Sequence, residues 1–172
     1  MIRRILGTAI FGYFALFIAL ILLLGFRWHK QRKAPEQPIA FSHLTHVGSL
    51  NLQCLFCHES ADKSYFAGVP AVQTCMNCHI GVRLDSPEVQ KIHEYWNNEE
   101  PIPWNRVHRI RIREHVYFSH ERHVKKDIDC IECHGEVKAM TQLRAVHSLK
   151  MGWCVSCHED REAPTDCLIC HM

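Results

Sequence analysis

The segment Cys54-Leu55-Phe56-Cys57-His58 decides the fold, because its pattern Cys-x-x-Cys-His occurs five times in a chain of 172 residues. The other copies are Cys75-Met76-Asn77-Cys78-His79, Cys130-Ile131-Glu132-Cys133-His134, Cys154-Val155-Ser156-Cys157-His158 and Cys167-Leu168-Ile169-Cys170-His171. All ten cysteines of the chain fall inside these motifs. The spacing is typical of c-type haem attachment, in which two thiols bond to the porphyrin edge and the adjacent histidine reaches the iron. The sequence therefore predicts five haem c groups.

Three other uses of cysteine fit the pattern less well. Zinc sites take ligands in fours, so five Cys-x-x-Cys pairs would leave one pair unmatched. A disulfide scaffold gives no reason for a histidine after every second cysteine. A thioredoxin-like redox motif occurs once, near a βαβ pattern.

The composition argues against a nucleic-acid partner. The chain has a formal net charge of +2, but two propionates on each of five haems would bring the holoprotein to roughly −8. We expect Arg109, Arg111 and Arg113 to pair with propionates or a partner surface. The exported part is small, so porphyrins must supply much of its core. The expected fold is mostly irregular with short α-helices, and the haem-free chain should be largely unfolded.

An uncharged apolar run of 22 residues, Ile5 to Phe26, lies near the N-terminus. It is long enough to cross a bilayer and exceeds the apolar core of a usual signal peptide, and no small-x-small cleavage site follows it. We expect an uncleaved transmembrane helix over about 5–26. The basic cluster from Arg27 to Lys33 would favour a cytoplasmic C-terminal side. Haem attachment outside the cytoplasm overrides this tendency, which gives an N-terminus inside and a haem domain on the periplasmic face of the inner membrane.

The rest of the chain divides into a first lobe, a spacer and a second lobe. Residues 34–81 form a two-haem lobe that begins with a short stiff linker over 34–40, and residues 116–172 form a three-haem lobe. The spacer over 82–115 contains a helix from about Ser86, with Ser86 as N-cap and Pro87 at the first helical position. Tyr95, Trp96, Trp104 and Trp153 are expected to pack against haems.

An internal repeat supplies candidates for the second iron ligand. Phe41-Ser42-His43-Leu44-Thr45-His46-Val47 matches Phe118-Ser119-His120-Glu121-Arg122-His123-Val124. On a helical turn, two histidines three residues apart can each reach a different iron. Nine histidines lie outside the motifs, and His29 flanks the membrane run. The other eight are candidates for five irons: His43, His46, His93, His108, His115, His120, His123 and His147. We expect ordinary structural roles for His93, His108 and His115, and core packing for Met76, Met140, Met151 and Met172.

The second lobe resembles the cytochromes of the c7 and c3 group, in its Phe-x-His-x-x-His segment, its three Cys-x-x-Cys-His motifs and a further histidine before the middle motif. This resemblance implies that His120 serves the haem of His134, His123 that of His158 and His147 that of His171. The first lobe would use His43 for the haem of His58 and His46 for that of His79. Relatives often lack a histidine at the place of His147, so His108, Met140 and Met151 stay open as alternatives.

Nearly the whole chain resembles the pentahaem cytochrome component of alternative complex III, a membrane-bound quinol oxidoreductase. The resemblance includes Ala67-Gly68-Val69-Pro70, Pro101-Ile102-Pro103-Trp104-Asn105-Arg106-Val107-His108 and Met151-Gly152-Trp153-Cys154. It implies an electron-transfer subunit, without catalysis of its own, that takes electrons from iron–sulfur clusters of a molybdopterin-type subunit. Its other partners would be polytopic quinol-binding subunits, a monohaem cytochrome c and a soluble acceptor.

Three rival functions stay open at this point. The first is a quinone reductase complex of related composition with reversed electron flow, and the second is a quinol dehydrogenase that binds quinol at a haem near the membrane. The third is a multihaem nitrite or hydroxylamine reductase, which needs an iron with an open coordination position. The supply of distal histidines argues against the third.

Overall fold

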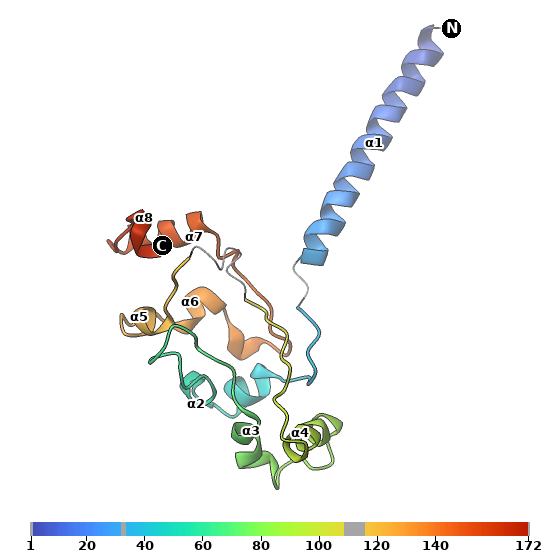
Figure 1. The fold of residues 1–172 in the computed structure, drawn as a ribbon. Coiled ribbons are helices and arrows are strands. Elements are labelled where there is room, and N and C mark those ends of the chain that lie inside the picture. The colour runs from blue at the N-terminus through green and yellow to red at the C-terminus, as the bar shows by residue number, and fades with distance from the viewer. Residues whose placement is uncertain (1, 32–33, 109–115, 172) are drawn as a thin grey trace. The chain divides into compact units, whose positions relative to one another are not determined.

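The computed structural model describes the backbone of residues 2–31, 34–108 and 116–171, and their side chains apart from 2–5, 8–9 and 27–31. The predicted roles of His115 and of the arginines at 109, 111 and 113 lie outside the described residues, as does the end of the spacer. The chain divides into two compact units, residues 1–33 and residues 34–172 (Figure 1).

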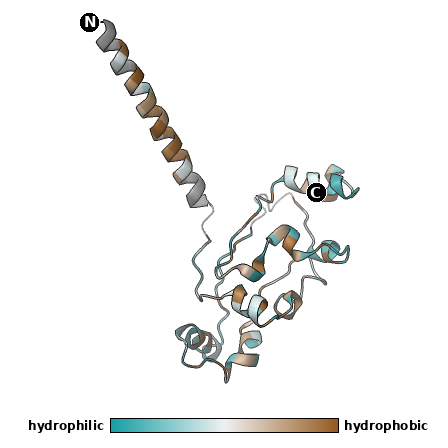
Figure 2. Cartoon of the chain, turned by 180° about the vertical axis from the view of Figure 1, so that it is seen from behind, coloured by the Kyte–Doolittle hydropathy of each residue, from teal (hydrophilic) through white to brown (hydrophobic). Residues whose placement is uncertain are grey.

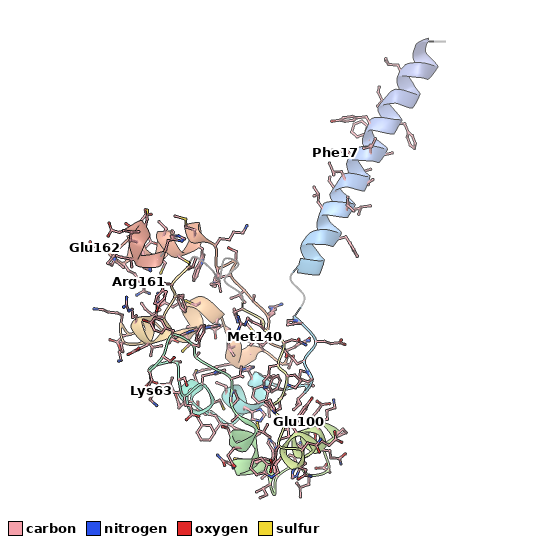
Figure 3. The ribbon with its side chains drawn as sticks, viewed as in Figure 1. Phe17, Lys63, Glu100, Met140, Arg161 and Glu162 are labelled. Carbon is pink, nitrogen blue, oxygen red and sulfur yellow. The ribbon has the colours of Figure 1, made fainter. Side chains whose placement is uncertain are left out.

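The first unit is the helix α1, Ile2–Gln31. The ribbon of its central turns has mostly the hydrophobic colour in Figure 2. The described large side chains, such as Phe17, stand away from the helix and are about half exposed or more (Figure 3). No stretch of helix within the described residues is both long and apolar enough to cross a membrane. The predicted transmembrane segment over 5–26 includes positions 5, 8 and 9, whose side chains lie outside the described part.

The second unit consists of short helices joined by irregular segments, and the described residues contain no strand. This confirms the predicted mostly irregular fold with short α-helices. The helical elements, in chain order, are the π-helix η1 Leu44–Ser49, α2 Cys54–Cys57, α3 Val72–His79, α4 Pro87–Asn97, α5 His120–Val124, α6 Cys130–His134, the 3₁₀ turn η2 Val137–Ala139, α7 Met151–Asp160 and α8 Cys167–Cys170.

The predicted spacer helix forms as α4, with Pro87 in its first turn and Ser86 at the N-cap position. Its apolar positions Val89 and Ile92 are buried, as their helical spacing requires. The Ser86 side chain makes no capping hydrogen bond. Trp96 lies on the exposed side of the helix.

A small apolar core holds the beginning of the second unit together. Ile39, Met76, Ile92 and Ile102 form its buried centre, and Val72, Cys75, Tyr95 and Trp104 pack against it. The core therefore joins the helix of the second motif to α4 and to the Pro101–Trp104 stretch. Met76 fills this core, as predicted.

The segment over 34–40, predicted as a short stiff linker, is packed into the second unit. Ile39 is only 3% exposed. The side chain of Gln37 donates to the carbonyl of Asn105 and accepts from its N–H, both at 2.9 Å. The backbone N–H of Ala40 donates to a Glu88 carboxylate oxygen at 2.6 Å. These contacts explain the Pro-Ile-Pro-Trp-Asn segment: its apolar residues enter the core and its asparagine holds the chain that leads into the first motif.

Candidate haem-binding site

Each Cys-x-x-Cys-His motif lies on or at the end of a short helix, namely α2, α3, α6, α7 or α8. One helical turn brings the two cysteines of a motif to neighbouring positions and places the histidine after them. All ten cysteines are free thiols. Burial raises the pKa of the Cys57, Cys75 and Cys133 thiols, which disfavours the thiolate that would start disulfide exchange.

Three predicted pairs of iron ligands face each other in the structure. The ring centroids of His46 and His79 lie 6.1 Å apart, those of His123 and His158 6.2 Å apart, and those of His120 and His134 6.4 Å apart. An imidazole nitrogen binds a transition metal at about 2.0 Å, and the ring centroid lies about 1.1 Å behind that nitrogen. Two imidazoles on opposite sides of one metal ion thus have centroids roughly 6.2 Å apart. These pairs have the spacing of two axial ligands to one iron.

The hydrogen bonds of these rings leave the correct nitrogen free. Six of these histidines direct Nδ1 to a backbone carbonyl oxygen at 2.7–3.0 Å. Five belong to the facing pairs, in which His134 is the exception, and the sixth is His58. The carbonyls are those of Ser42 for His46, Gly68 for His58, Val82 for His79, Tyr65 for His120, Ser119 for His123 and Pro164 for His158. A carbonyl oxygen only accepts, so Nδ1 must carry the hydrogen and Nε2 presents a lone pair. This arrangement is usual for metal-ligating histidine.

The carbonyl that accepts the hydrogen bond from His58 belongs to Gly68, whose backbone conformation is one that glycine adopts easily. Gly68 has φ of 72°, in the left-handed region. The loop after the first motif can therefore turn its carbonyl onto the proximal histidine. The glycine of the Ala67–Pro70 segment thus supports a histidine ten residues earlier in the chain.

The internal repeat recurs in three dimensions. Phe41 stacks on His46 with a centroid separation of 4.4 Å and meets His43 edge-on at 4.9 Å. Phe118 stacks on His123 at 4.7 Å and meets His120 edge-on at 4.8 Å. The predicted helical turns are present in both copies, as η1 preceded by His43 and as α5. In each copy, the phenylalanine therefore contacts both imidazole rings and restricts their rotation.

The two remaining predicted pairs are His43 with His58 and His147 with His171. His43 is near His58. Burial, and after it the charge of His58, lowers the pKa of His43 to about 4. The His147 ring stacks on Trp153 with a centroid separation of 4.9 Å. The pairing of His147 with His171 stays a prediction.

His93 and the three alternative ligands, Met140, Met151 and His108, lie in other surroundings. The Nε2 atom of His93 is 2.9 Å from the carbonyl of His79, so this nitrogen already has a partner. Met140 is buried (Figure 3), and its carbonyl accepts from the Leu44 N–H, which places it beside η1. Met151 begins α7 and is 64% exposed. His108 lies against His134 with 3.3 Å between His134 Nδ1 and His108 Nε2, a contact for which the sequence carries no signal.

Neighbouring thiols place the motifs in a spatial order that differs from their order in the chain. Among the causes that raise the pKa of these thiols, after burial, is the charge of a nearby cysteine: Cys57 for Cys75, Cys54 for Cys130, Cys157 for Cys133 and Cys170 for Cys154. The motifs therefore follow one another as second, first, third, fourth and fifth. Figure 1 shows the same succession of helices, α3, α2, α6, α7 and α8.

Direct contacts support this order at several joints. The N–H of Leu44, in η1, donates to the carbonyl of Met140, just after η2, at 2.9 Å. The His120 N–H donates to the Tyr65 carbonyl at 3.1 Å, which joins the second copy of the repeat to the loop after the first motif. Arg161, beyond the fourth motif, pairs with Glu132 inside the third at 2.5 Å.

Two buried side-chain nitrogens have no protein hydrogen-bond partner within the described residues: Trp104 Nε1, which donates, and His43 Nδ1, which donates if Nε2 binds an iron. Buried donors without partners call for a further acceptor. Haem c fits here, because each haem brings two carboxylates and Trp104 packs against the same apolar core as Cys75 of the second motif. The thiol pairs, the facing imidazoles and the unmatched donors together suit haem c.

Residues 116–172 match the family described as Cytochrome c7 and related cytochrome c. These residues form a c7-like multihaem domain. The chain is similar to the menaquinone reductase multiheme cytochrome c subunit of Nitratidesulfovibrio vulgaris, with 27% identity over 186 residues that cover 90% of this chain and 88% of that protein. It is also similar to the acrylate reductase cytochrome subunit of Shewanella woodyi, with 26% identity over 113 residues, 66% of this chain and 68% of that protein. The matched residues contain the third, fourth and fifth motifs and the facing pairs His120–His134 and His123–His158.

Proposed function

We propose that the chain is a membrane-anchored pentahaem c-type cytochrome that serves as the electron-transfer subunit of a quinone-linked oxidoreductase complex. The observation that carries this proposal is the set of three histidine pairs at the spacing of two axial iron ligands. Haem iron so ligated supplies one-electron chemistry without binding a substrate.

The protein residues then have defined tasks. The thiols of each motif hold a porphyrin, and the paired imidazoles close both faces of its iron. Backbone carbonyls fix the imidazole tautomers, and the phenylalanines of the repeat restrict their rotation. The order of the motifs in space makes the haems of His79 and His171 the two ends of the path. Electrons would enter at one end and leave at the other.

The membrane anchor and the location of the haem domain are part of the proposal. Its support is the uncharged run from Ile5 to Phe26 and the exposed apolar side chains of α1. An apolar surface of this extent needs lipid or a protein partner. The helix would cross the inner membrane with the N-terminus inside, and residues 34–172 would lie on the periplasmic face.

For the complex, we propose the quinol-oxidising type, alternative complex III, on the resemblance of the Pro101–His108 and Met151–Cys154 segments. The haems would receive electrons from the iron–sulfur clusters of a molybdopterin-type partner. They would pass them to a monohaem cytochrome c or a soluble acceptor. A second candidate, a menaquinone reductase complex with the opposite flow, is favoured by the similarity to the protein from Nitratidesulfovibrio vulgaris over 90% of this chain.

Purification of the tagged full-length chain from its native membrane in mild detergent tests the proposal. We expect polytopic subunits and an iron–sulfur protein to co-purify, and the haems of this complex to be reduced by added quinol. Rapid oxidation of pre-reduced haems by added quinone, without reduction by quinol, would select the second candidate. A chain that purifies alone and exchanges electrons with neither quinol nor quinone would refute both.

A further inference from the structure

His134 is supported differently from three other proximal histidines. His58, His79 and His158 each direct Nδ1 to a backbone carbonyl oxygen. His134 instead directs Nδ1 to the side chain of His108, with 3.3 Å between Nδ1 and Nε2. The two rings meet nearly at right angles, with a centroid separation of 4.4 Å and an interplanar angle of 84°.

The geometry determines which nitrogen donates. His120 faces the His134 ring with a nearly parallel plane at 6.4 Å, so one neighbour of His134 has the spacing of an opposing iron ligand. His108 lies on the Nδ1 side of the same ring. If Nε2 of His134 binds the iron, Nδ1 must carry the hydrogen and Nε2 of His108 must accept it. His108 then has its own hydrogen on Nδ1.

The backbone that leads to His108 is well anchored. Ile102 is buried in the core beside Met76 and Ile92. Asn105 is held on both sides of its peptide by the Gln37 side chain and donates to the Glu36 carbonyl at 2.7 Å. The His108 ring is therefore held near its position by contacts that do not involve the third motif.

We propose that His108 is a positioning residue for His134: its Nε2 accepts the Nδ1–H and so fixes the tautomer, orientation and donor strength of this iron ligand. The proposal rests on the proposed function, in which His134 binds a haem iron. A stronger hydrogen-bond acceptor for the Nδ1–H of His134 makes the His134 imidazole more basic. A more basic ligand stabilises Fe(III) over Fe(II). The haem of the third motif should therefore have a lower reduction potential with His108 than without it.

Two substitutions at this position separate hydrogen bonding from packing. His108→Gln keeps an oxygen that can accept, whereas His108→Leu keeps comparable bulk and removes the acceptor. His93→Leu is the matched control, since His93 also contacts a proximal histidine, but only its backbone carbonyl. His120→Met marks the haem of the third motif, because it changes the ring that faces His134.

EPR-monitored redox titration of the full-length holoprotein is the test, with haem content of each variant measured first. We expect His108→Leu to raise the potential and change the low-spin g values of one haem, the same one that His120→Met alters. His108→Gln should restore both towards wild type, and His93→Leu should leave them unchanged.

Three results would overturn the inference. One is an unchanged potential and unchanged g values in His108→Leu, and another is an equal change in the Gln and Leu variants, which would show a packing role alone. The third is a new high-spin iron in both variants, which would make His108 an iron ligand itself. A wild-type protein without low-spin haem would instead refute the proposed function.

Discussion

Removal of His123 should open a single iron and leave the other four closed. His123 faces His158 at 6.2 Å, so we expect it to be the second axial ligand of the fourth haem. His123→Ala removes that ligand and also the hydrogen bond of 2.7 Å from its Nδ1 to the Ser119 carbonyl. The loss of this bond costs about 1 kcal/mol. The turn keeps its cap, because the Ser119 hydroxyl still accepts from the Arg122 N–H.

The expected size of the effect follows from the number of motifs. With five haems in the chain, one open iron converts one fifth of the total from low spin to high spin. The reduced variant should bind one carbon monoxide per chain, whereas the wild type should bind none. EPR spin quantitation and carbon monoxide titration of the purified full-length protein measure both quantities.

His93→Ala is the control, because this histidine contacts the carbonyl of His79 and faces no other imidazole at ligand spacing within the described residues. It should stay entirely low-spin. The ligand assignment fails if His123→Ala remains entirely low-spin with its full haem content, or if the His93 control shows the same high-spin fraction.

Three further changes probe the rest of the architecture. Ile92→Ala should destabilise the holoprotein by about 2–4 kcal/mol, because it leaves a cavity in the apolar core. The control Ile80→Ala, at a side chain that is 70% exposed, should change the unfolding free energy by less than about 0.5 kcal/mol. Equal melting temperatures of the two variants would contradict the core assignment. Phe118→Leu removes the ring stacked on His123 and should broaden the EPR signal of one haem, while an unaltered spectrum would exclude the phenylalanine as the device that fixes the ring. Expression without haem attachment should give residues 34–172 as a largely unfolded chain by circular dichroism, and a cooperative thermal transition there would show that the small core suffices.

Much of the site could be predicted from the sequence because covalent haem attachment has a fixed local pattern. The five motifs predict where the proximal histidines lie, and the Phe-x-His-x-x-His repeat predicts their partners. His46, His120 and His123 face the proximal histidines that the resemblance assigned to them. The α4 helix was also predictable, since a proline in the first turn and apolar residues at helical spacing depend on local physics alone.

The features that the sequence could not predict depend on contacts between distant segments. The first and second motifs exchange places in space because η1 packs beside η2, far along the chain. The segment over 34–40 has the composition of a linker, yet Ile39 enters the core and Gln37 pairs with Asn105. His108 carries no local signal of its contact with His134, 26 residues away.

The mass of the purified full-length chain under denaturing conditions tests the central claim most directly, because only covalently attached haem survives denaturation. The account predicts the mass of the polypeptide plus five haem increments, one for each motif. A mass with fewer than five increments, in protein made by cells that attach haem c to other cytochromes, would contradict it.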